Sequence, residues 1–177
     1  MDKPGVPDQT QVLTFLDEAA CRKVLSRYSP ALDWRDPEAL SDTIWPDAAV
    51  DYGFFKGSGE EYVRAFIEIE RAAVRPFHML VCDQLEVNGQ YAEAESLGIA
   101  LTIETLPDGV VAARQYWGRY LDQLHKRGKE WRISRRNHLV HGVFDVAIRE
   151  FGPGTLQGLH VADDLRVQHP MYRRFNH

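Results

Sequence analysis

The second half of the chain contains four long segments of β-like composition, separated by short turns. The segments are Phe77–Val87, Tyr91–Thr105, Val110–Leu124 and Trp131–Ile148. The turns are Asn88-Gly89, Pro107-Asp108-Gly109 and Lys126-Arg127-Gly128-Lys129, and each supplies a glycine for the positive φ that a tight hairpin requires. Long strands joined by such turns predict an antiparallel meander.

The first half shows helical spacing instead. From Thr10 onward, apolar residues recur at steps of three and four on one face of a predicted helix, at Leu13, Leu16, Ala20, Val24 and Tyr28. We expect Ser29-Pro30 to end or kink this helix, because a proline ring clashes with the preceding turn. Asp36-Pro37-Glu38 predicts the start of a second, short helix that stops near Trp45-Pro46, since it combines an N-cap acceptor, a first-turn proline and an acid.

A strand and a third helix complete this half. Ala48 to Phe55 is strand-like, and Ser58 or Gly59 can cap a helix from Glu60 to about Val74. The expected buried stripe of that helix is Tyr62, Phe66 and Ile69. Helices followed by antiparallel strands predict an α+β fold. We expect a cone-shaped, curved antiparallel β-sheet with three N-terminal helices that enclose a pocket for a small hydrophobic ligand.

Length and composition limit the other possibilities. A chain of 177 residues is most simply one domain, here residues 1–150, followed by an irregular C-terminal extension at 151–177. The net charge of −5 argues against a nucleic-acid or anionic-membrane partner, because both require a basic face. No segment approaches the ~18 apolar residues of a membrane span, and we find no secretory leader. We therefore expect a cytoplasmic protein in which Cys21 and Cys82 stay reduced.

A single histidine stands inside the apolar run RPFHML. His78 is either a core histidine satisfied by hydrogen bonds or a base that faces the pocket. Asp33 is either a turn residue ahead of the second helix or a carboxylate that orients the histidine ring. The catalytic interpretation of this pair requires a fold that brings the two side chains together.

Two tyrosines and one arginine complete this set of candidates. Tyr28 and Tyr52 are either core aromatics or phenols that donate a hydrogen bond to a bound carbonyl or leaving group. In WRISRRNHL, strand alternation places Trp131 and Ile133 opposite Arg136 and His138. A guanidinium in a dry pocket would stabilise a developing negative charge.

Other chemistries lack the motifs that they require. His138 and His141 would point to opposite faces of a strand, and no HExxH or clustered acids support a metal site. The sequence contains no GxGxxG, GxxxxGK[ST] or GxSxG, which argues against nucleotide cofactors and serine hydrolysis. We expect neither a metal nor a cofactor.

Three stretches resemble the SnoaL-like family of the nuclear transport factor 2-like superfamily. They are VLSRYSPALDWRDPEALSDTIWPDAAVDYG, FHMLVCDQLEVNGQYAEAES and WGRYLDQLHKRGKEWRISRRNHLV. Members of this superfamily include scytalone dehydratase, bile acid 7α-dehydratase, hexachlorocyclohexane dehydrochlorinase and ketosteroid isomerase. The resemblance implies the cone-shaped fold and a homotrimer or homodimer built on the outer sheet face.

The resemblance also implies roles for individual residues. The aspartate–histidine dyad of the eliminating members falls on Asp33 and His78, the tyrosine of their pockets on Tyr28, and their late-strand arginine on Arg136. By the same resemblance the substrate would contact Tyr52, Trp45, Phe54, Trp117 and His138. The chloride-eliminating member has lysine at the position of Tyr28, which argues against dehalogenation.

Three functions fit this sequence. The first is a cofactor-independent lyase of the dehydratase type, which acts on a small hydrophobic cyclic or polycyclic substrate through the histidine–aspartate dyad. The second is a non-catalytic ligand-binding or structural subunit, such as the small subunit of a ring-hydroxylating dioxygenase. The third is an isomerase similar to ketosteroid isomerase, although a lone carboxylate base would suit that reaction better.

Overall fold

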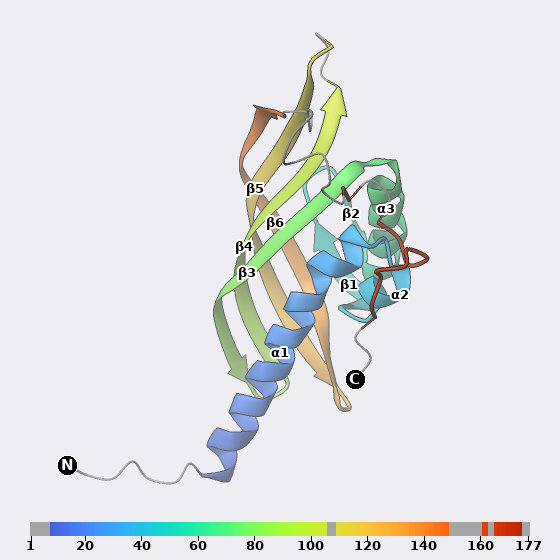
Figure 1. Ribbon diagram of the computed structural model, residues 1–177. Helices are drawn as coiled ribbons and strands as arrows, with labels where there is room; N and C mark the ends of the chain where they lie inside the picture. The colour runs from blue at the N-terminus through green and yellow to red at the C-terminus, as the bar shows by residue number, and fades with distance from the viewer. Residues whose placement is uncertain (1–7, 106–108, 149–160, 163–164, 175–177) are drawn as a thin grey trace, which may run out of the picture.

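The computed structural model describes residues 8–105, 109–148, 161–162 and 165–174. These residues form the helices α1 (Gln9–Asp33), α2 (Pro37–Ser41) and α3 (Gly59–Ala72). They also form the strands β1 (Ile44–Asp51), β2 (Lys56–Ser58), β3 (Val74–Asn88), β4 (Tyr91–Thr105), β5 (Val111–Arg127) and β6 (Glu130–Ala147). The helices lie together on one side of a long, curved sheet, as the α+β prediction required (Figure 1).

The sheet has the strand order β2-β1-β6-β5-β4-β3. The predicted meander is confirmed, because β3, β4, β5 and β6 pair antiparallel in sequence order. One pairing differs from the predicted antiparallel pattern, since β1 pairs parallel to β6, with Val50 opposite Arg136. The chain reverses direction at three hairpins after β3, and β6 then lies beside β1 and runs in the same direction as β1. The sheet is therefore mixed.

Helix α1 runs past Pro30, where the sequence predicted an end or a kink. Proline inside a helix costs about 3 kcal/mol, but the next turn buries Ala31 and Leu32 almost completely and offsets that cost. The helix ends in a Schellman motif, in which Arg35 N donates to Leu32 O and Asp36 N donates to Ala31 O, both at 2.9 Å. Arg35 takes the left-handed position of this motif with φ of 52°.

One other predicted boundary and one predicted buried residue need correction. Helix α2 ends at Ser41, and β1 begins at Ile44, so the segment around Pro46 belongs to a strand and not to the end of a helix. In α3, Tyr62 and Phe66 are buried as predicted, but Ile69 is 46% exposed and Glu70 takes the buried position. The stripe therefore continues by a four-residue step from Phe66.

The core lies between α1, α3 and the concave face of the sheet. Helix α1 contributes Cys21, Val24, Leu25, Tyr28 and Leu32, which pack with Leu124, Trp131 and Ile133 of the last two strands. The opposite face of the sheet leaves large apolar side chains exposed, namely Phe77, Met79, Val81, Leu97, Trp117, Leu121, Leu139 and Phe144. This set of residues is called the outer face below.

The described part of the C-terminal extension lies on the helices of its own chain. Trp34 contacts the rings of His169 and Tyr172 at centroid distances of 5.6 and 5.5 Å. Arg174 pairs with Asp36 at 2.8 Å, and the Tyr172 hydroxyl donates to the same carboxylate. Residues 151–160 lie outside the described residues. None of the described helices is both long and apolar enough to cross a membrane.

Candidate active site

A pocket of about 620 Å³ opens between α3 and the concave face of the sheet. Its walls are mostly apolar, with Phe54, Phe66, Ile69, Val140 and Val143 among the lining residues. The polar groups that line it are Tyr28, Tyr52, Glu70, His78, Thr102, Tyr116, Tyr120 and His138. An apolar cavity with a few converging polar groups is the typical form of a small-molecule site.

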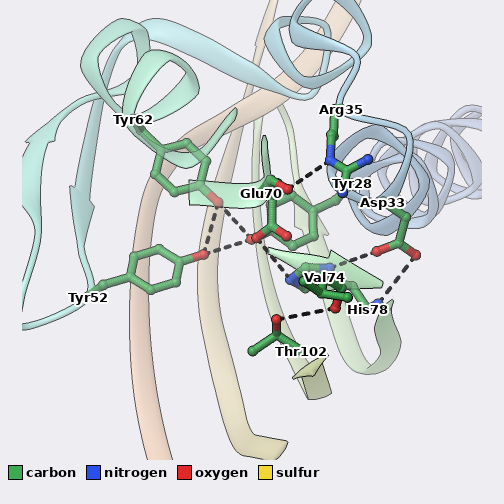
Figure 2. A network of polar contacts seen from close by, with 9 residues as sticks. All are labelled: Tyr28, Asp33, Arg35, Tyr52, Tyr62, Glu70, Val74, His78 and Thr102. Atoms are coloured by element: carbon green, nitrogen blue, oxygen red, sulfur yellow. Dashed lines mark hydrogen bonds and ion pairs between the residues drawn. The ribbon is translucent and has the colours of Figure 1, made fainter. Parts of the chain in front are cut away.

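The fold brings His78 and Asp33 together. His78 Nδ1 is 2.8 Å from Asp33 Oδ1, and the His78 main-chain N–H donates to Asp33 Oδ2 at 3.3 Å (Figure 2). Asp33 is the last residue of α1, so the continuation of the helix past Pro30 places this carboxylate. His78 stands on β3 opposite Ala100 of β4, on the concave side of the sheet.

This geometry sets the state of the His78 ring. Asp33 accepts the proton on Nδ1, which leaves Nε2 as the nitrogen that can accept a proton. Burial by itself lowers the pKa of His78, but the Asp33 hydrogen bond and the negative charges of Glu70 and Asp33 outweigh burial and raise it. The ring therefore holds a proton more readily than a free histidine does.

Glu70 is a site residue that the sequence reasoning missed. Its Oε1 is 3.6 Å from His78 Nε2, and its side chain is 8% exposed (Figure 2). Burial raises the pKa of Glu70, and the charge of Asp33 adds to this effect, while His78 and Arg35 oppose it. The available signal was spacing, because Tyr62, Phe66 and Glu70 stand four residues apart on α3.

Three tyrosine hydroxyls meet beside the pocket (Figure 2). Tyr28 Oη is 2.6 Å from Tyr62 Oη and 2.9 Å from Tyr52 Oη, and the Tyr52–Tyr62 distance is 3.1 Å. Burial raises the pKa of Tyr28 and of Tyr62 well above the ordinary value, so both phenols stay neutral donors. Tyr62 was not predicted as part of the site.

His138 lines the pocket as predicted, and it does so as a neutral ring. It lies 4.7 Å from the rings of both Tyr52 and Tyr120. Burial and the charge of Arg136 lower its pKa to about 4. Gly98 and Gly118, paired across β4 and β5, make room for these rings, since a Cβ at Gly118 would lie 2.5 Å from His138 Nε2.

Arg136 does not face the pocket, contrary to the prediction. Its side chain is fully buried and forms a two-pronged pair with Asp122, with Nε–Oδ1 at 2.8 Å and Nη2–Oδ2 at 2.7 Å. The guanidinium also lies 4.1 Å from the Tyr28 ring centre. A β-bulge at Ser134 puts Arg136 on the same concave face as Ile133. There Asp122 and the rings of Tyr28 and Tyr120 enclose the guanidinium and keep it out of the pocket.

Two further predicted contact residues lie away from the pocket. The ring of Trp45 contacts the guanidinium groups of Arg127 and Arg132, whose central carbons lie 4.7 and 4.8 Å from the ring centre. Strand alternation turns this side chain away from the buried side of β1. Trp117 lies on the outer face against Phe144, since its neighbours Tyr116 and Gly118 take the concave positions. Phe54, by contrast, lines the pocket, although most of its surface is exposed.

Among the residues that the structure describes, no three histidine, cysteine or acidic side chains cluster in a way that could hold a metal ion. The pocket brings together a histidine, a buried glutamate and several tyrosines. Such groups can move protons and stabilise a developing oxyanion.

Comparison with solved structures shows the same fold. A protein from Novosphingobium aromaticivorans titled "Putative Scytalone Dehydratase" has a TM-score of 0.64 and 21% identity, over 76% of this chain and 91% of the matched chain. A hexachlorocyclohexane dehydrochlorinase, LinA type 2, has a TM-score of 0.67 and 19% identity, over 80% and 96% of the two chains. A second N. aromaticivorans protein, described as a "Putative Aromatic Ring Hydroxylase", has a TM-score of 0.63 and 20% identity, over 75% of this chain and 94% of the matched chain.

No curated protein matches the sequence significantly. The family model described as "SnoaL-like domain" matches residues 14–137, which is more than half of the chain and includes most of α1, all of α3, His78 and the whole of β3 to β5. The chain therefore belongs to the SnoaL-like domain family.

Proposed function

We propose that this protein is a cofactor-independent lyase that eliminates water from a small, hydrophobic cyclic substrate. The observation that carries the proposal is the 2.8 Å contact between His78 Nδ1 and Asp33 Oδ1 at the wall of a mostly apolar pocket. Two structural neighbours are titled as a dehydratase and a dehydrochlorinase, and elimination is the reaction common to both names.

The proposed chemistry begins with a carbonyl group that acidifies the neighbouring C–H bond. His78 Nε2 removes that proton while Asp33 stabilises the imidazolium that forms. Tyr28 or Tyr52 donates a hydrogen bond to the carbonyl oxygen, which becomes negatively charged as the proton leaves. Since the three tyrosine hydroxyls use their protons on one another, a bound carbonyl would redirect one of them.

The test is turnover of a panel of cyclic β-hydroxy ketones with one to four rings. Loss of water gives a conjugated enone, which absorbs in the ultraviolet, and mass spectrometry of the product separates dehydration from isomerisation. We expect His78→Gln and Asp33→Asn to lower kcat by ~10²–10⁴-fold. His125→Gln is the matched control, because His125 stacks on Tyr91 at 4.6 Å and does not line the pocket.

Two results would reject the lyase proposal. One is a His78→Gln variant that turns over as fast as the wild type. The other is tight binding of the panel, measured by calorimetry, without conversion of any member. The second result would favour the alternative of a ligand-binding or structural subunit.

We also propose that the protein assembles as a homo-oligomer through the outer face. Eight large apolar side chains are exposed there on β3 to β6. An apolar patch of this kind on a folded domain typically marks an interaction surface. Light scattering of the purified protein measures the assembly directly, and a monomer at all concentrations would refute it.

A further inference from the structure

The carboxylate of Glu70 has an unusual environment for a buried acid. Within the described part of the chain, no lysine or arginine side chain lies within ion-pair distance of it, and its charged neighbour is His78, with Oε1 and Nε2 3.6 Å apart. Arg35 binds the Glu70 main-chain oxygen at 2.7 Å and not the carboxylate. A buried carboxylate without a paired cation is costly unless it holds a proton. The state of Glu70 therefore depends on the state of His78.

His78 and Glu70 can share one proton in two ways. Either the ring is an imidazolium beside a carboxylate, or it is a neutral imidazole beside a carboxylic acid. Asp33 accepts the Nδ1 proton in both arrangements. The charged groups that act on the pair are Asp33 at the end of α1, Arg35 just after it and the two partners themselves on α3 and β3. Groups coupled in this way titrate together.

We propose that Glu70 is the second proton-transfer residue of the elimination, the acid that protonates the departing hydroxide. The proposal rests on the lyase function proposed above. In the arrangement with neutral His78 and protonated Glu70, a base and an acid stand side by side and both line the pocket. The base can remove a hydrogen from one carbon of a ring, and the acid can protonate a hydroxyl group that leaves the neighbouring carbon on the same face.

The step balances without any outside proton. His78 Nε2 takes the proton from carbon, the C–H electron pair becomes the new C=C bond, and the C–O bond breaks. The Glu70 proton passes to the leaving oxygen and gives water. The imidazolium and carboxylate that remain are the other arrangement of the same pair, so transfer of one proton from Nε2 to Glu70 restores the starting state.

Leaving-group dependence tests the role of the acid. The probes are 3-hydroxycyclohexanone, whose hydroxide needs protonation, and 3-acetoxycyclohexanone, whose acetate leaves without it. Glu70→Gln keeps the size and polarity of the side chain but cannot supply the proton. We expect it to lower kcat on the hydroxy ketone by ~10²-fold or more and to leave the acetoxy ketone near the wild-type rate.

The control is Glu68→Gln on the same helix, because Glu68 is exposed and pairs with Arg71 at the surface. We expect it to change neither rate. Equal losses on both ketones with Glu70→Gln would overturn the acid role and leave the lyase proposal standing. A His78→Gln variant that still converts both ketones, or a wild-type protein that converts neither, would reject the lyase step and with it the acid role.

Nuclear magnetic resonance measures the coupling between His78 and Glu70 without any need for turnover. The pKa of His78 is followed through its ring nitrogens in the wild type, in Glu70→Gln and in Glu68→Gln. We expect the pKa to fall in Glu70→Gln, because the negative charge that helps to raise it is gone, and to stay unchanged in Glu68→Gln. An unchanged His78 pKa in Glu70→Gln would overturn the inference.

Discussion

Replacing Arg136 with methionine should destabilise the protein far more than replacing a surface arginine on the same two strands. Arg136 and Asp122 face each other across β5 and β6, and both side chains are fully buried. Methionine fills a similar volume but leaves the Asp122 carboxylate without its cation. A buried charge that loses its partner is the costly case among ion-pair deletions.

The expected loss follows from this burial. Breaking a buried ion pair costs ~3–5 kcal/mol, which in a chain of this size corresponds to a fall in Tm of roughly 6–20 °C. The double variant Arg136→Met with Asp122→Leu should recover most of that loss, because neither side of the pair then carries a charge. Tyr28 and Tyr120 also lose the cation that lies 4.1 and 4.8 Å from their ring centres, which adds a smaller cost.

The pair of Arg114 and Asp145 provides the matched control. It joins the same two strands through two hydrogen bonds of 2.8 and 3.1 Å, but the side chains are 29% and 38% exposed. Arg114→Met should cost ~0.2–1 kcal/mol. Urea unfolding followed by tryptophan fluorescence and circular dichroism measures all four proteins. A loss with Arg136→Met no larger than with Arg114→Met, or a double variant less stable than Arg136→Met alone, would contradict this prediction.

Three further predictions concern titration, packing and assembly. The pKa of His78 is raised above 6.5 in the folded state, so the stability that its protonation contributes is complete below pH ~6.5 and is lost as the pH rises through the folded pKa. Thermal unfolding across pH ~5–9 should show this loss of stability. Asp33→Asn should make the loss smaller. Gly118→Ala places a methyl group 2.5 Å from His138 Nε2, so we expect a loss of ~1–3 kcal/mol in urea unfolding. Trp117→Glu should dissociate the proposed oligomer in light scattering and leave the circular dichroism spectrum unchanged.

The hairpins of the sheet could be predicted because their signals are local. A glycine with positive φ stands in each of the three turns, at Gly89, Gly109 and Gly128, and β4 begins and ends at the predicted residues. The parallel pairing of β1 with β6 has no such signal. It joins segments more than 80 positions apart, and the apparent helix stop at Pro46 lies inside β1.

The site was predicted in part. The dyad of Asp33 and His78 came from family resemblance, since 45 positions separate the two residues and no spacing rule connects them. The same resemblance places Arg136 in the pocket, but no local signal reveals its partner Asp122 on the neighbouring strand, which holds the guanidinium in the core. Glu70 looked like an ordinary charge on a helix rich in glutamate, and its burial becomes visible once α3 is packed on the sheet.

Arg35 connects the end of α1 with the end of α3. It follows Asp33 by two positions and takes the left-handed place in the Schellman motif that ends α1. Its guanidinium donates to the main-chain oxygen of Glu70 at 2.7 Å, near the end of α3 (Figure 2). It also donates to the main-chain oxygen of Ala73 at 3.1 Å, just after α3 ends. One side chain thus ties together the two helix ends that place carboxylates on either side of the His78 ring. The same guanidinium donates to Leu165 O, so the C-terminal extension contacts the residue that joins these two helix ends.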